Sequence, residues 1–271
     1  MRSRSYVLEN PSTIALAHNQ AEHSILSPLI RKLELLEPLS GEAKSRLRKL
    51  SARLVSFAPR ENLLREAEPR GDVQILLDGV AVRFKNLEDR RAILGFLLPG
   101  DVDEADVFVD MLDHGIVAIT AGKLALIPRL AFAQLVTDFP DLGRGFRRMA
   151  RRDDSISRVW LTNMGQRAAD KQAAHLFCEL RARFEAAGMG GPDWFTNPLT
   201  QEDLADVLGI SPVHMNRVMQ HLRGLDLIRL DRHVVRFPSP AKLQEYCDFD
   251  DGYLQGAMAR APKMARVLEP Q

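Results

Sequence analysis

One predicted helix near the carboxyl end of the chain carries polar side chains that suit contacts with a DNA duplex. It begins at Ser211 and Pro212, because serine caps helix starts and proline is tolerated at the first helical position. Its predicted buried stripe consists of Met215, Val218, Met219 and Leu222. At about 100° per residue, the opposite face points away from that stripe. We predict that this face reads DNA bases through Val213, His214, Asn216, Arg217 and Gln220.

The side chains on this face differ in the bases that they can recognise. Arg217 can donate two parallel hydrogen bonds to guanine, and Val213 can pack on the methyl group of thymine. Asn216 and Gln220 can pair with adenine or bind phosphate. The residues predicted to contact the DNA backbone are Thr200, Ser211, His221, Arg223 and Arg232. A solvated helix face remains the alternative interpretation for each of these side chains except Arg217.

A shorter helix is predicted just before this one, and together the two form a helix-turn-helix. Thr200 caps its start, with Asp203 as an acidic residue of the first turn. Gly209 then suits a tight turn, because it lacks the Cβ atom that would clash there. The apolar, alanine and glycine positions of this segment together match the motif. Two strand-like runs, Leu225–Leu230 and His233–Phe237, predict a β-hairpin wing behind the second helix.

A long helical pattern begins at Pro140, with apolar residues spaced alternately four and three apart. This spacing is typical of the seam between two helices that pair. The predicted seam residues are Leu142, Phe146, Met149, Asp153, Ile156 and Trp160. We predict that this helix pairs with its copy in a homodimer, and a helix packed on its own domain remains the alternative. A second helix is predicted from Gly165 to Ala187, and Gly188 ends it.

Short apolar or alternating runs fill the front of the chain and predict strands. These runs are Leu54–Phe57, Asn62–Leu64, Val73–Leu77, Val80–Phe84, Ile93–Leu98, Ile116–Ile119 and Leu124–Pro128. Asp78-Gly79 predicts a tight hairpin between two of them, since glycine accepts a positive φ. A short amphipathic helix is expected before them, within Leu33–Leu50 and after the turn at Pro38–Gly41. The predicted fold class is α+β, with a β-roll or jelly-roll front, a long helix and a winged helix-turn-helix.

The predicted organisation comprises a tail (1–24), a β-roll sensor domain (25–138), a dimerisation helix (139–163), a winged helix-turn-helix (164–249) and a second tail (250–271). The chain has 37 basic and 36 acidic residues, so its net charge of +1 neither favours nor excludes nucleic acid. We see no secretory leader and no apolar run of about 20 residues, and we expect a cytoplasmic bacterial protein. Two cysteines cannot form a disulfide framework, which fits a reducing compartment. The sequence shows no Ser/His/Asp, Cys/His or paired-carboxylate arrangement of the kind that catalytic sites use. We therefore expect that the protein is not an enzyme.

The β-rich front, the long helix and the winged helix-turn-helix together resemble the CRP/FNR superfamily of bacterial transcription regulators, over most of Leu33–Phe249. The most specific part is Leu199–Arg223, and Ala174–Leu180 is similar to alphaproteobacterial members. The resemblance implies that Arg217 reads a base. Members often carry an acid where this chain has Val213, which implies a changed target sequence. The resemblance also implies a homodimer on a roughly palindromic site, with half-sites about one helical turn apart.

The region that binds cyclic nucleotides in some members of that family departs from their pattern. Those members have a phosphate cassette with Gly-Glu and a downstream Arg, whereas Gly100–Gly115 contains no Arg. Its acidic residues, which would repel a phosphate, are Asp101, Asp103, Glu104, Asp106, Asp110 and Asp113. We therefore expect no cyclic nucleotide at the usual site. We also expect no iron–sulfur cluster, because the front lacks a cysteine cluster, and we predict no other cofactor and no metal site.

Several side chains keep two interpretations. His114 is expected in a solvated loop, with haem ligation as the alternative. The acidic stretch is expected to be solvated, with a divalent cation as the alternative. Cys178 is expected to pack in a buried helix face, with a redox switch as the alternative. A run of basic residues is expected to form a solvated face beside Asp153 and Asp154, and its members are Arg144, Arg147, Arg148, Arg151 and Arg152.

These observations predict a sequence-specific transcription regulator that binds double-stranded DNA as a homodimer. Its further expected partner is RNA polymerase, and no membrane partner is expected. In the predicted mechanism the β-roll biases the long helix, which sets the spacing of two recognition helices. Three alternatives remain: an effector-gated sensor with an altered β-roll pocket, a winged helix used as a protein-interaction module, and an enzymatic front domain, which the missing catalytic cluster disfavours.

Overall fold

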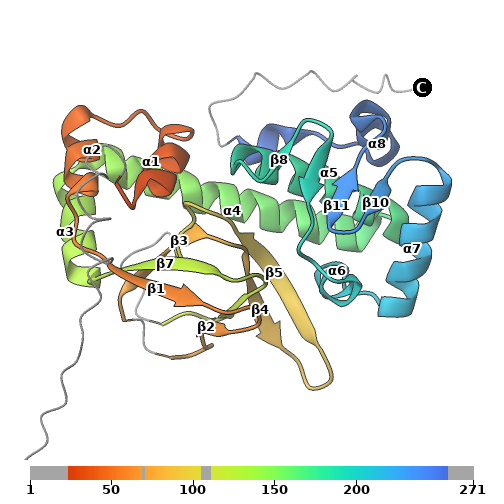
Figure 1. Cartoon of the computed structure of the whole chain (residues 1–271), viewed down its shortest axis with the longest axis horizontal. Helices are drawn as coiled ribbons and strands as arrows, with labels where there is room; N and C mark the ends of the chain where they lie inside the picture. The colour runs from red at the N-terminus through yellow and green to blue at the C-terminus, as the bar shows by residue number, and fades with distance from the viewer. Residues whose placement is uncertain (1–23, 69–70, 105–110, 256–271) are drawn as a thin grey trace, which may run out of the picture.

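Two antiparallel sheets form the front of the molecule (Figure 1). One has the order β1-β7-β3, with β1 at Arg53–Phe57, β7 at Gly122–Ile127 and β3 at Val73–Asp78. The other has the order β2-β6-β4-β5, with β2 at Asn62–Leu64, β6 at Gly115–Ala118, β4 at Ala81–Asn86 and β5 at Arg91–Leu97. The computed structural model describes residues 24–68, 71–104 and 111–255. Each strand run predicted in the front corresponds to one of these strands, so the predicted β-rich front is confirmed.

The hairpin predicted at Asp78-Gly79 is wrong, although the glycine has the expected conformation. Gly79 has φ +90°, and a Cβ atom there would lie 2.7 Å from the carbonyl oxygen of Ala121. β3 pairs with β7, whereas β4 pairs with β5 and β6. Asp78-Gly79 therefore carries the chain from one sheet to the other. Turn chemistry predicts a bend, but strand pairing depends on contacts that are distant in sequence.

Helices pack beside the β-roll (Figure 1). They are α1 at Ser27–Glu34, α2 at Gly41–Arg48, α3 at Arg129–Asp138 and α4 at Pro140–Gln166. α2 is the helix predicted after the Pro38–Gly41 turn, and the Ser40 hydroxyl caps it by accepting the Ala43 N–H at 3.2 Å. α4 begins at Pro140 as predicted, whereas α1 and α3 were not predicted.

The stripe of α4 predicted as a dimer seam faces its own chain, so that prediction is wrong. The residues concerned are Leu142, Phe146, Met149, Asp153, Ile156 and Trp160. The apolar ones are buried against the β-roll, its flanking helices and the carboxyl-terminal part. Asp153 accepts a hydrogen bond from Arg83 of β4 at 3.1 Å. Heptad spacing shows that a helix buries one face, but it does not show whether the cover is its own chain or a copy.

Trp160 of α4 contacts both the β-roll and the helix that follows α4. Its Nε1–H donates to Oε2 of buried Glu179 at 2.9 Å, and its ring stands edge-on to Phe96 of β5, with centroids 5.7 Å apart. Arg183 donates to Glu179 Oε1 at 3.2 Å and to the carbonyl oxygen of Phe96 at 2.8 Å. The β-roll, α4 and the helix that follows it are therefore joined at one point.

The arginine-rich run of α4 is only partly solvated. Arg144 and Arg148 pair with Glu37 at 2.6 and 3.1 Å. Arg152 also pairs within the chain, with Asp101. Arg147 and Arg151 are exposed, so the predicted solvated face applies to those two side chains. Among the helices of the described ranges, none has both the length and the apolar character that crossing a membrane requires.

The carboxyl-terminal part combines helices with a small antiparallel sheet. Its helices are α5 at Ala169–Ala186, α6 at Gln201–Leu208, α7 at Pro212–Gly224 and α8 at Pro240–Cys247, followed by the 3-10 helix η2 at Asp251–Leu254. The sheet has the order β10-β11-β9-β8, with β10 at Arg229–Asp231, β11 at Val234–Arg236, β9 at Trp194–Thr196 and β8 at Gly190–Gly191. β10 and β11 form the predicted wing, but the strand predicted from Leu225 begins only at Arg229. β8 and β9, which were not predicted, extend the wing into a wider sheet.

A buried histidine in α5 is expected to make stability depend on pH. His175 is 3% exposed and lies against the rings of Phe249 and Tyr253. Burial, together with nearby Arg167, lowers the pKa of His175 from 6.5 to about 4. As the pH falls through this interval, the unfolded chain binds a proton that the folded chain does not yet bind. We expect the free energy of unfolding to fall by up to about 3 kcal/mol over that interval because of this residue.

The variant His175→Leu removes the titrating group and is expected to flatten this part of the stability profile. Denaturant unfolding at a series of pH values between 4 and 7 measures the slope. His233→Leu, at an exposed position in the wing, is the matched control and should keep the wild-type slope. An unchanged slope in the His175 variant would show that another group titrates.

Candidate nucleic-acid interface

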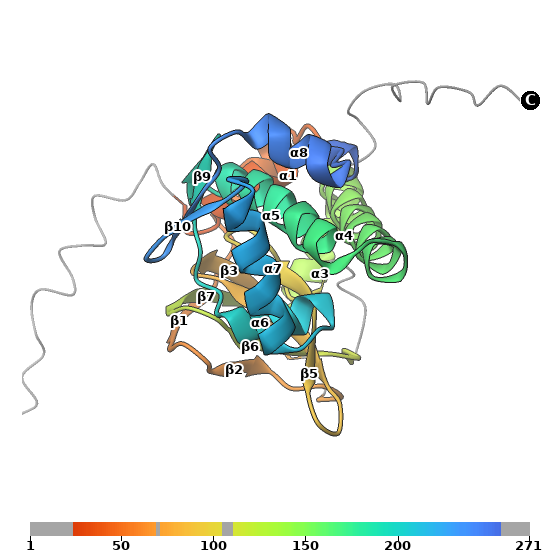
Figure 2. The same ribbon diagram turned by 90° about the vertical axis from the view of Figure 1, so that its right-hand side faces the viewer.

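The second helix of the motif presents its predicted DNA-reading face to solvent. The Oγ atom of Ser211 caps α7 by accepting the His214 N–H at 3.2 Å. The buried stripe is the predicted one, and it consists of Met215, Val218, Met219 and Leu222. The exposed residues opposite it are Val213, His214, Asn216, Arg217 and Gln220. Figure 2 shows α7 at the surface, in front of α5 and α6, where a duplex could reach it.

The first helix of the motif is capped and terminated as the sequence predicts. Thr200 Oγ1 accepts the Asp203 N–H at 3.1 Å, and Asp203 Oδ2 accepts the Thr200 N–H at 2.9 Å. Gly209 ends α6 in the left-handed region with φ +66°, where a residue with a Cβ atom would be strained. The Thr200 hydroxyl also donates to Asp203 at 2.8 Å. A phosphate contact from Thr200 would therefore have to replace a hydrogen bond within the chain.

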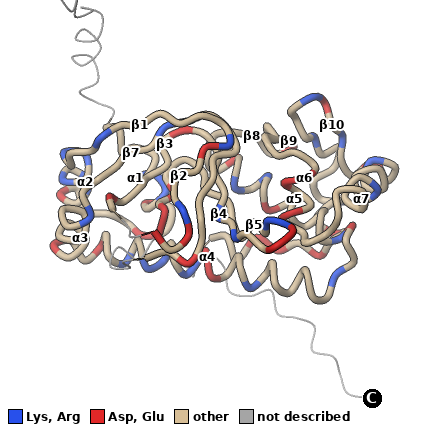
Figure 3. The backbone as a smooth tube through the Cα atoms, turned by 90° about the horizontal axis from the view of Figure 1, so that it is seen from below, with Lys and Arg blue, Asp and Glu red and all other residues tan. Residues whose placement is uncertain are grey.

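The other residues predicted to contact the DNA backbone differ in their surroundings. Arg223 near the end of α7 and Arg232 in the wing turn are both exposed, and Arg232 has φ +51°. His221 is exposed, but its Nε2 lies 3.5 Å from the Tyr246 hydroxyl and 3.8 Å from the Asp170 carboxylate. Figure 3 shows basic residues on α7 and in the loop beside β10. The two arginines thus suit a phosphate contact better than His221 does.

A cluster of charged residues, which was not predicted from the sequence, attaches the motif to the β-roll. Arg60 donates to both carboxylate oxygens of Asp203, at 2.7 and 2.8 Å. Arg91 of β5 donates to Asp203 at 2.8 Å and to Asp206 at 2.9 Å. Asp203 is 1% exposed, and although burial opposes it, hydrogen bonds from Arg60 and Thr200 hold the pKa of its carboxyl well below the ordinary value. Arg60 and Asp203 are 143 positions apart, so no local pattern signals the pair.

An open cleft of about 650 Å³ lies beside this cluster, between the β-roll and the motif. Thr200 and Ser211, which cap α6 and α7, both line it, and so do Arg60 and Arg90 from the β-roll. The carboxylates of Asp89, Glu202, Asp203 and Asp206 line the cleft as well, so it presents both charges beside the two caps.

Replacing Arg60 and Arg91 together by alanine is expected to loosen the motif from the β-roll. The buried Asp203 carboxylate would keep its bonds to Thr200 but lose its cations. We expect the free energy of unfolding to fall by about 1–3 kcal/mol. The loss is smaller than for a fully buried ion pair, because Arg60 is 46% exposed and solvent screens its charge. Urea unfolding measures the change. Arg53→Ala, which removes the exposed 3.9 Å pair with Asp72, is the matched control with an expected loss below about 0.5 kcal/mol. A double variant as stable as this control would contradict the attachment.

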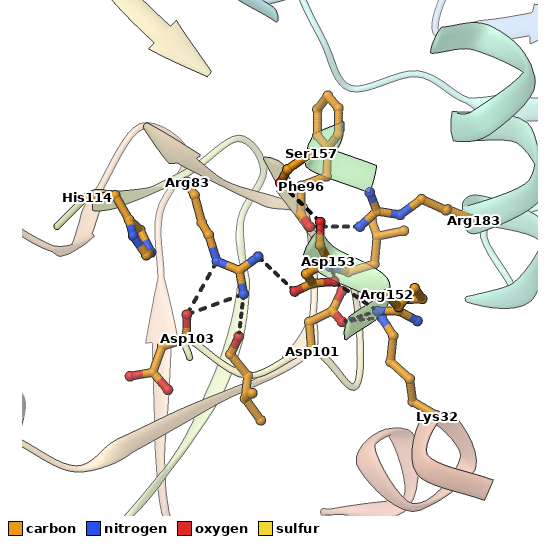
Figure 4. A network of polar contacts seen from close by, with 12 residues as sticks. Lys32, Arg83, Phe96, Asp101, Asp103, His114, Arg152, Asp153, Ser157 and Arg183 are labelled. Atoms are coloured by element: carbon orange, nitrogen blue, oxygen red, sulfur yellow. Dashed lines mark hydrogen bonds and ion pairs between the residues drawn. The ribbon is translucent and has the colours of Figure 1, made fainter. Parts of the chain in front are cut away.

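The start of the acidic loop after β5 is buried among basic side chains, so the predicted solvated loop is wrong for Asp101 and Asp103, whereas the Asp113 side chain is 85% exposed (Figure 4). Asp101 is 3% exposed and pairs with Lys32 of α1 at 2.5 Å and with Arg152 of α4 at 3.2 Å. Arg83 of β4 donates to the carbonyl oxygen of Asp103, which is 2% exposed. Burial lowers the pKa of Lys32 to about 8. Although burial opposes it, the positive charges of Lys32 and Arg152 hold the pKa of the Asp101 carboxyl well below its ordinary value.

The described part of the β-roll contains a buried histidine and a small cavity. His114, predicted in a solvated loop, is 7% exposed, and its Nδ1 lies 3.0 Å from the Asp113 carboxylate. Asp106 and Asp110 of the acidic stretch lie outside the described residues. The cavity bordered by Gln74, Leu97 and their neighbours measures about 10 Å³, which is about the space that one water molecule needs. A cavity of this size is too small for a nucleotide, and residues 105–110 of the neighbouring loop lie outside the described residues.

Comparisons with known proteins agree with this architecture. Residues 171–246 match the Crp-like helix-turn-helix domain family. The transcriptional activator protein FnrL of Cereibacter sphaeroides is 28% identical over 193 residues, which cover 67% of this chain and 75% of that protein. The nitrogen fixation regulation protein FixK of Bradyrhizobium diazoefficiens is 28% identical over 201 residues, which cover 71% and 81%.

Solved structures show the same fold. The structure of FixK2 from Bradyrhizobium japonicum matches with a TM-score of 0.66 and 20% identity, covering 73% of this chain and 98% of that one. A CooA mutant from Carboxydothermus hydrogenoformans matches with a TM-score of 0.61 and 17% identity, covering 79% and 94%. The predicted α+β fold, with its β-rich front and carboxyl-terminal helix-turn-helix, is thus confirmed.

Proposed function

Because this chain belongs to the CRP/FNR superfamily, we propose that it is a transcription regulator that binds specific DNA sites as a homodimer. The observation that carries the proposal is the orientation of α7, whose apolar stripe is buried while Arg217 and its polar neighbours are exposed. Such a helix fits the major groove, where Arg217 can bind guanine through two hydrogen bonds. Phosphate contacts from Arg223 and Arg232 add affinity that does not depend on sequence. Since FnrL is named an activator, RNA polymerase is the further partner that we propose.

In this proposal, the second copy packs on the face of α4 that its own chain leaves uncovered. That face includes Leu161, which is 69% exposed, and Met164, which is 47% exposed. Arg151, Asp154 and Arg158 are exposed at helical spacing before them. The two apolar side chains can be buried against a copy, and the charged ones can pair across a two-fold axis. A symmetric pair would place two α7 helices about one helical turn of DNA apart.

We also infer that the β-roll binds no cyclic nucleotide at the usual site and acts by positioning α4. The small size of the cavity bordered by Gln74 and Leu97 supports this inference, and so does the pairing of Asp101 with Lys32 and Arg152. The cations that a phosphate would need are already bound to the chain's own carboxylates. The relatives that match are regulators, which agrees with a role without catalysis.

In vitro selection of DNA sites by the purified full chain tests the proposed function. We expect an enriched palindrome with half-sites about 10 base pairs apart, bound with an affinity that falls steeply as salt rises. Adding cyclic AMP should leave the affinity for the selected site unchanged, and a large gain would favour the effector-gated alternative. If no sequence is enriched and the affinity does not depend on salt, the winged helix is a protein-interaction module instead.

A further inference from the structure

The two cysteines of the chain meet inside the carboxyl-terminal part. Cys178 lies in α5 and Cys247 is the last residue of α8, and 69 positions separate them. Their Sγ atoms are 3.9 Å apart, and both residues are buried. We propose that this pair is an oxidisable dithiol, which closes into an intrachain disulfide and thereby shifts α8 against the recognition helix α7.

The geometry requires only a small movement of sulfur. A disulfide bond is about 2.0 Å long, so the two sulfurs must approach by about 2 Å. Cys178 is held in the middle of a long helix, whereas Cys247 ends a short one and precedes Asp248, which has φ +51°. The Cys247 thiol donates a hydrogen bond to the Leu243 carbonyl oxygen at 3.1 Å, a bond that closure would break. Cys247 is therefore the side that moves.

The chemistry assigns different roles to the two sulfurs. The hydrogen bond from the Cys178 thiol, and more weakly Arg167, lower the pKa of Cys247. The same hydrogen bond and burial raise the pKa of Cys178. Cys247 is thus the sulfur that attacks as a thiolate, because the thiolate is the nucleophile. Since both sulfurs are buried, the oxidant reaches them through local opening of α8.

Hydrogen peroxide is a suitable oxidant, and the reaction balances with it alone. The Cys247 thiolate attacks one peroxide oxygen, the O–O bond breaks, and the departing hydroxide takes up a proton to form water. The Cys178 sulfur then attacks the resulting sulfenic acid, forming the S–S bond and releasing a second water that carries the Cys178 proton. In total the two thiols lose two electrons and two protons, and the peroxide is reduced to two waters.

Tyr246 connects this site to the DNA-reading helix. It adjoins Cys247, and its hydroxyl donates a hydrogen bond to the Asp170 carboxylate and lies 3.5 Å from Nε2 of His221 in α7. Figure 2 shows α8 lying beside α5. Pulling Cys247 toward Cys178 moves Tyr246 and disturbs its contact with His221. This consequence rests on the proposed function, whereas disulfide formation does not.

The first measurement follows the thiols in the full chain under native conditions. After treatment with peroxide, we expect both thiols to disappear together, with a mass loss equal to two hydrogen atoms, and dithiothreitol should restore them. Cys178→Ser and Cys247→Ser each leave one thiol and should show no such loss. Circular dichroism confirms that the variants fold, and Cys178→Ala replaces the serine variant if that one does not. Two thiols that persist, or that gain oxygen atoms independently, would overturn the proposal.

The second measurement compares oxidised and reduced protein on the selected DNA site. We expect oxidation to weaken binding about tenfold, which corresponds to about 1.4 kcal/mol, and reduction to restore it. The double variant lacking both cysteines should show no response to peroxide, which controls for oxidation of the nine methionines. A reversible disulfide with unchanged affinity would overturn the coupling to α7. Reduced protein that binds no site would instead contradict the proposed function, and the thiol measurement would stand on its own.

Discussion

Arg217→Ala is expected to weaken binding to the preferred DNA site by about 1–3 kcal/mol, or roughly 5- to 150-fold, and to flatten the sequence preference. Arg217 is exposed in the middle of α7, opposite the buried Val218 and Met219. Its guanidinium can donate two parallel hydrogen bonds to one guanine, and alanine can donate none. Titrations by fluorescence anisotropy measure both effects, on the selected site and on a site with that guanine replaced.

Arg223→Ala is the matched control for this experiment. Arg223 is exposed near the end of the same helix, where a phosphate contact is expected. Removing the Arg223 side chain should weaken binding equally on both sites. It should also reduce, by about one, the slope of the logarithm of the binding constant against the logarithm of the salt concentration. If Arg217→Ala also reduces the free energy of DNA binding by the same amount on both sites, direct base reading by Arg217 is rejected.

Trp160→Glu is expected to destabilise the fold of the chain by at least about 3–5 kcal/mol, the cost of removing a buried tryptophan. The indole is 7% exposed and donates to the buried Glu179 carboxylate. A glutamate there would remove one of the hydrogen bonds to Glu179 Oε2, which the Tyr253 hydroxyl also donates to, and would place two carboxylates together in the core, which adds to the cost. Urea unfolding followed by circular dichroism measures the loss at a fixed protein concentration.

Leu161→Glu, at the next position along α4, is the matched control because its side chain is 69% exposed. We expect this variant to keep its secondary structure but to sediment as a monomer, since it places a charge on the proposed contact between copies. A Trp160 variant that folds normally and only loses the dimer would show that Trp160 faces the partner. If the Leu161 variant remains a dimer, the two copies meet on another face of the molecule.

Much of the helix-turn-helix could be predicted because its signals are local. Thr200 and Ser211 cap their helices through hydrogen bonds to residues three positions ahead, and Gly209 ends α6 by its own conformation. The buried stripe of α7 follows from its 3.6-residue period, which also fixes Arg217 on the exposed face. The strands of the β-roll could be located for the same reason, but their pairing could not.

The sequence alone determined most of the helices and strands, though not, for example, α1, α3, β8 or β9, and it determined the apolar faces of α4 and α7, because caps, turns and periodicity act over a few residues. Only the tertiary structure decided what covers each face. It turned the stripe of α4 around Trp160 toward its own chain, joined Arg60 to Asp203, and brought Cys178 to Cys247. Such contacts depend on how distant segments pack, and the period of a pattern carries no information about the partner that buries it.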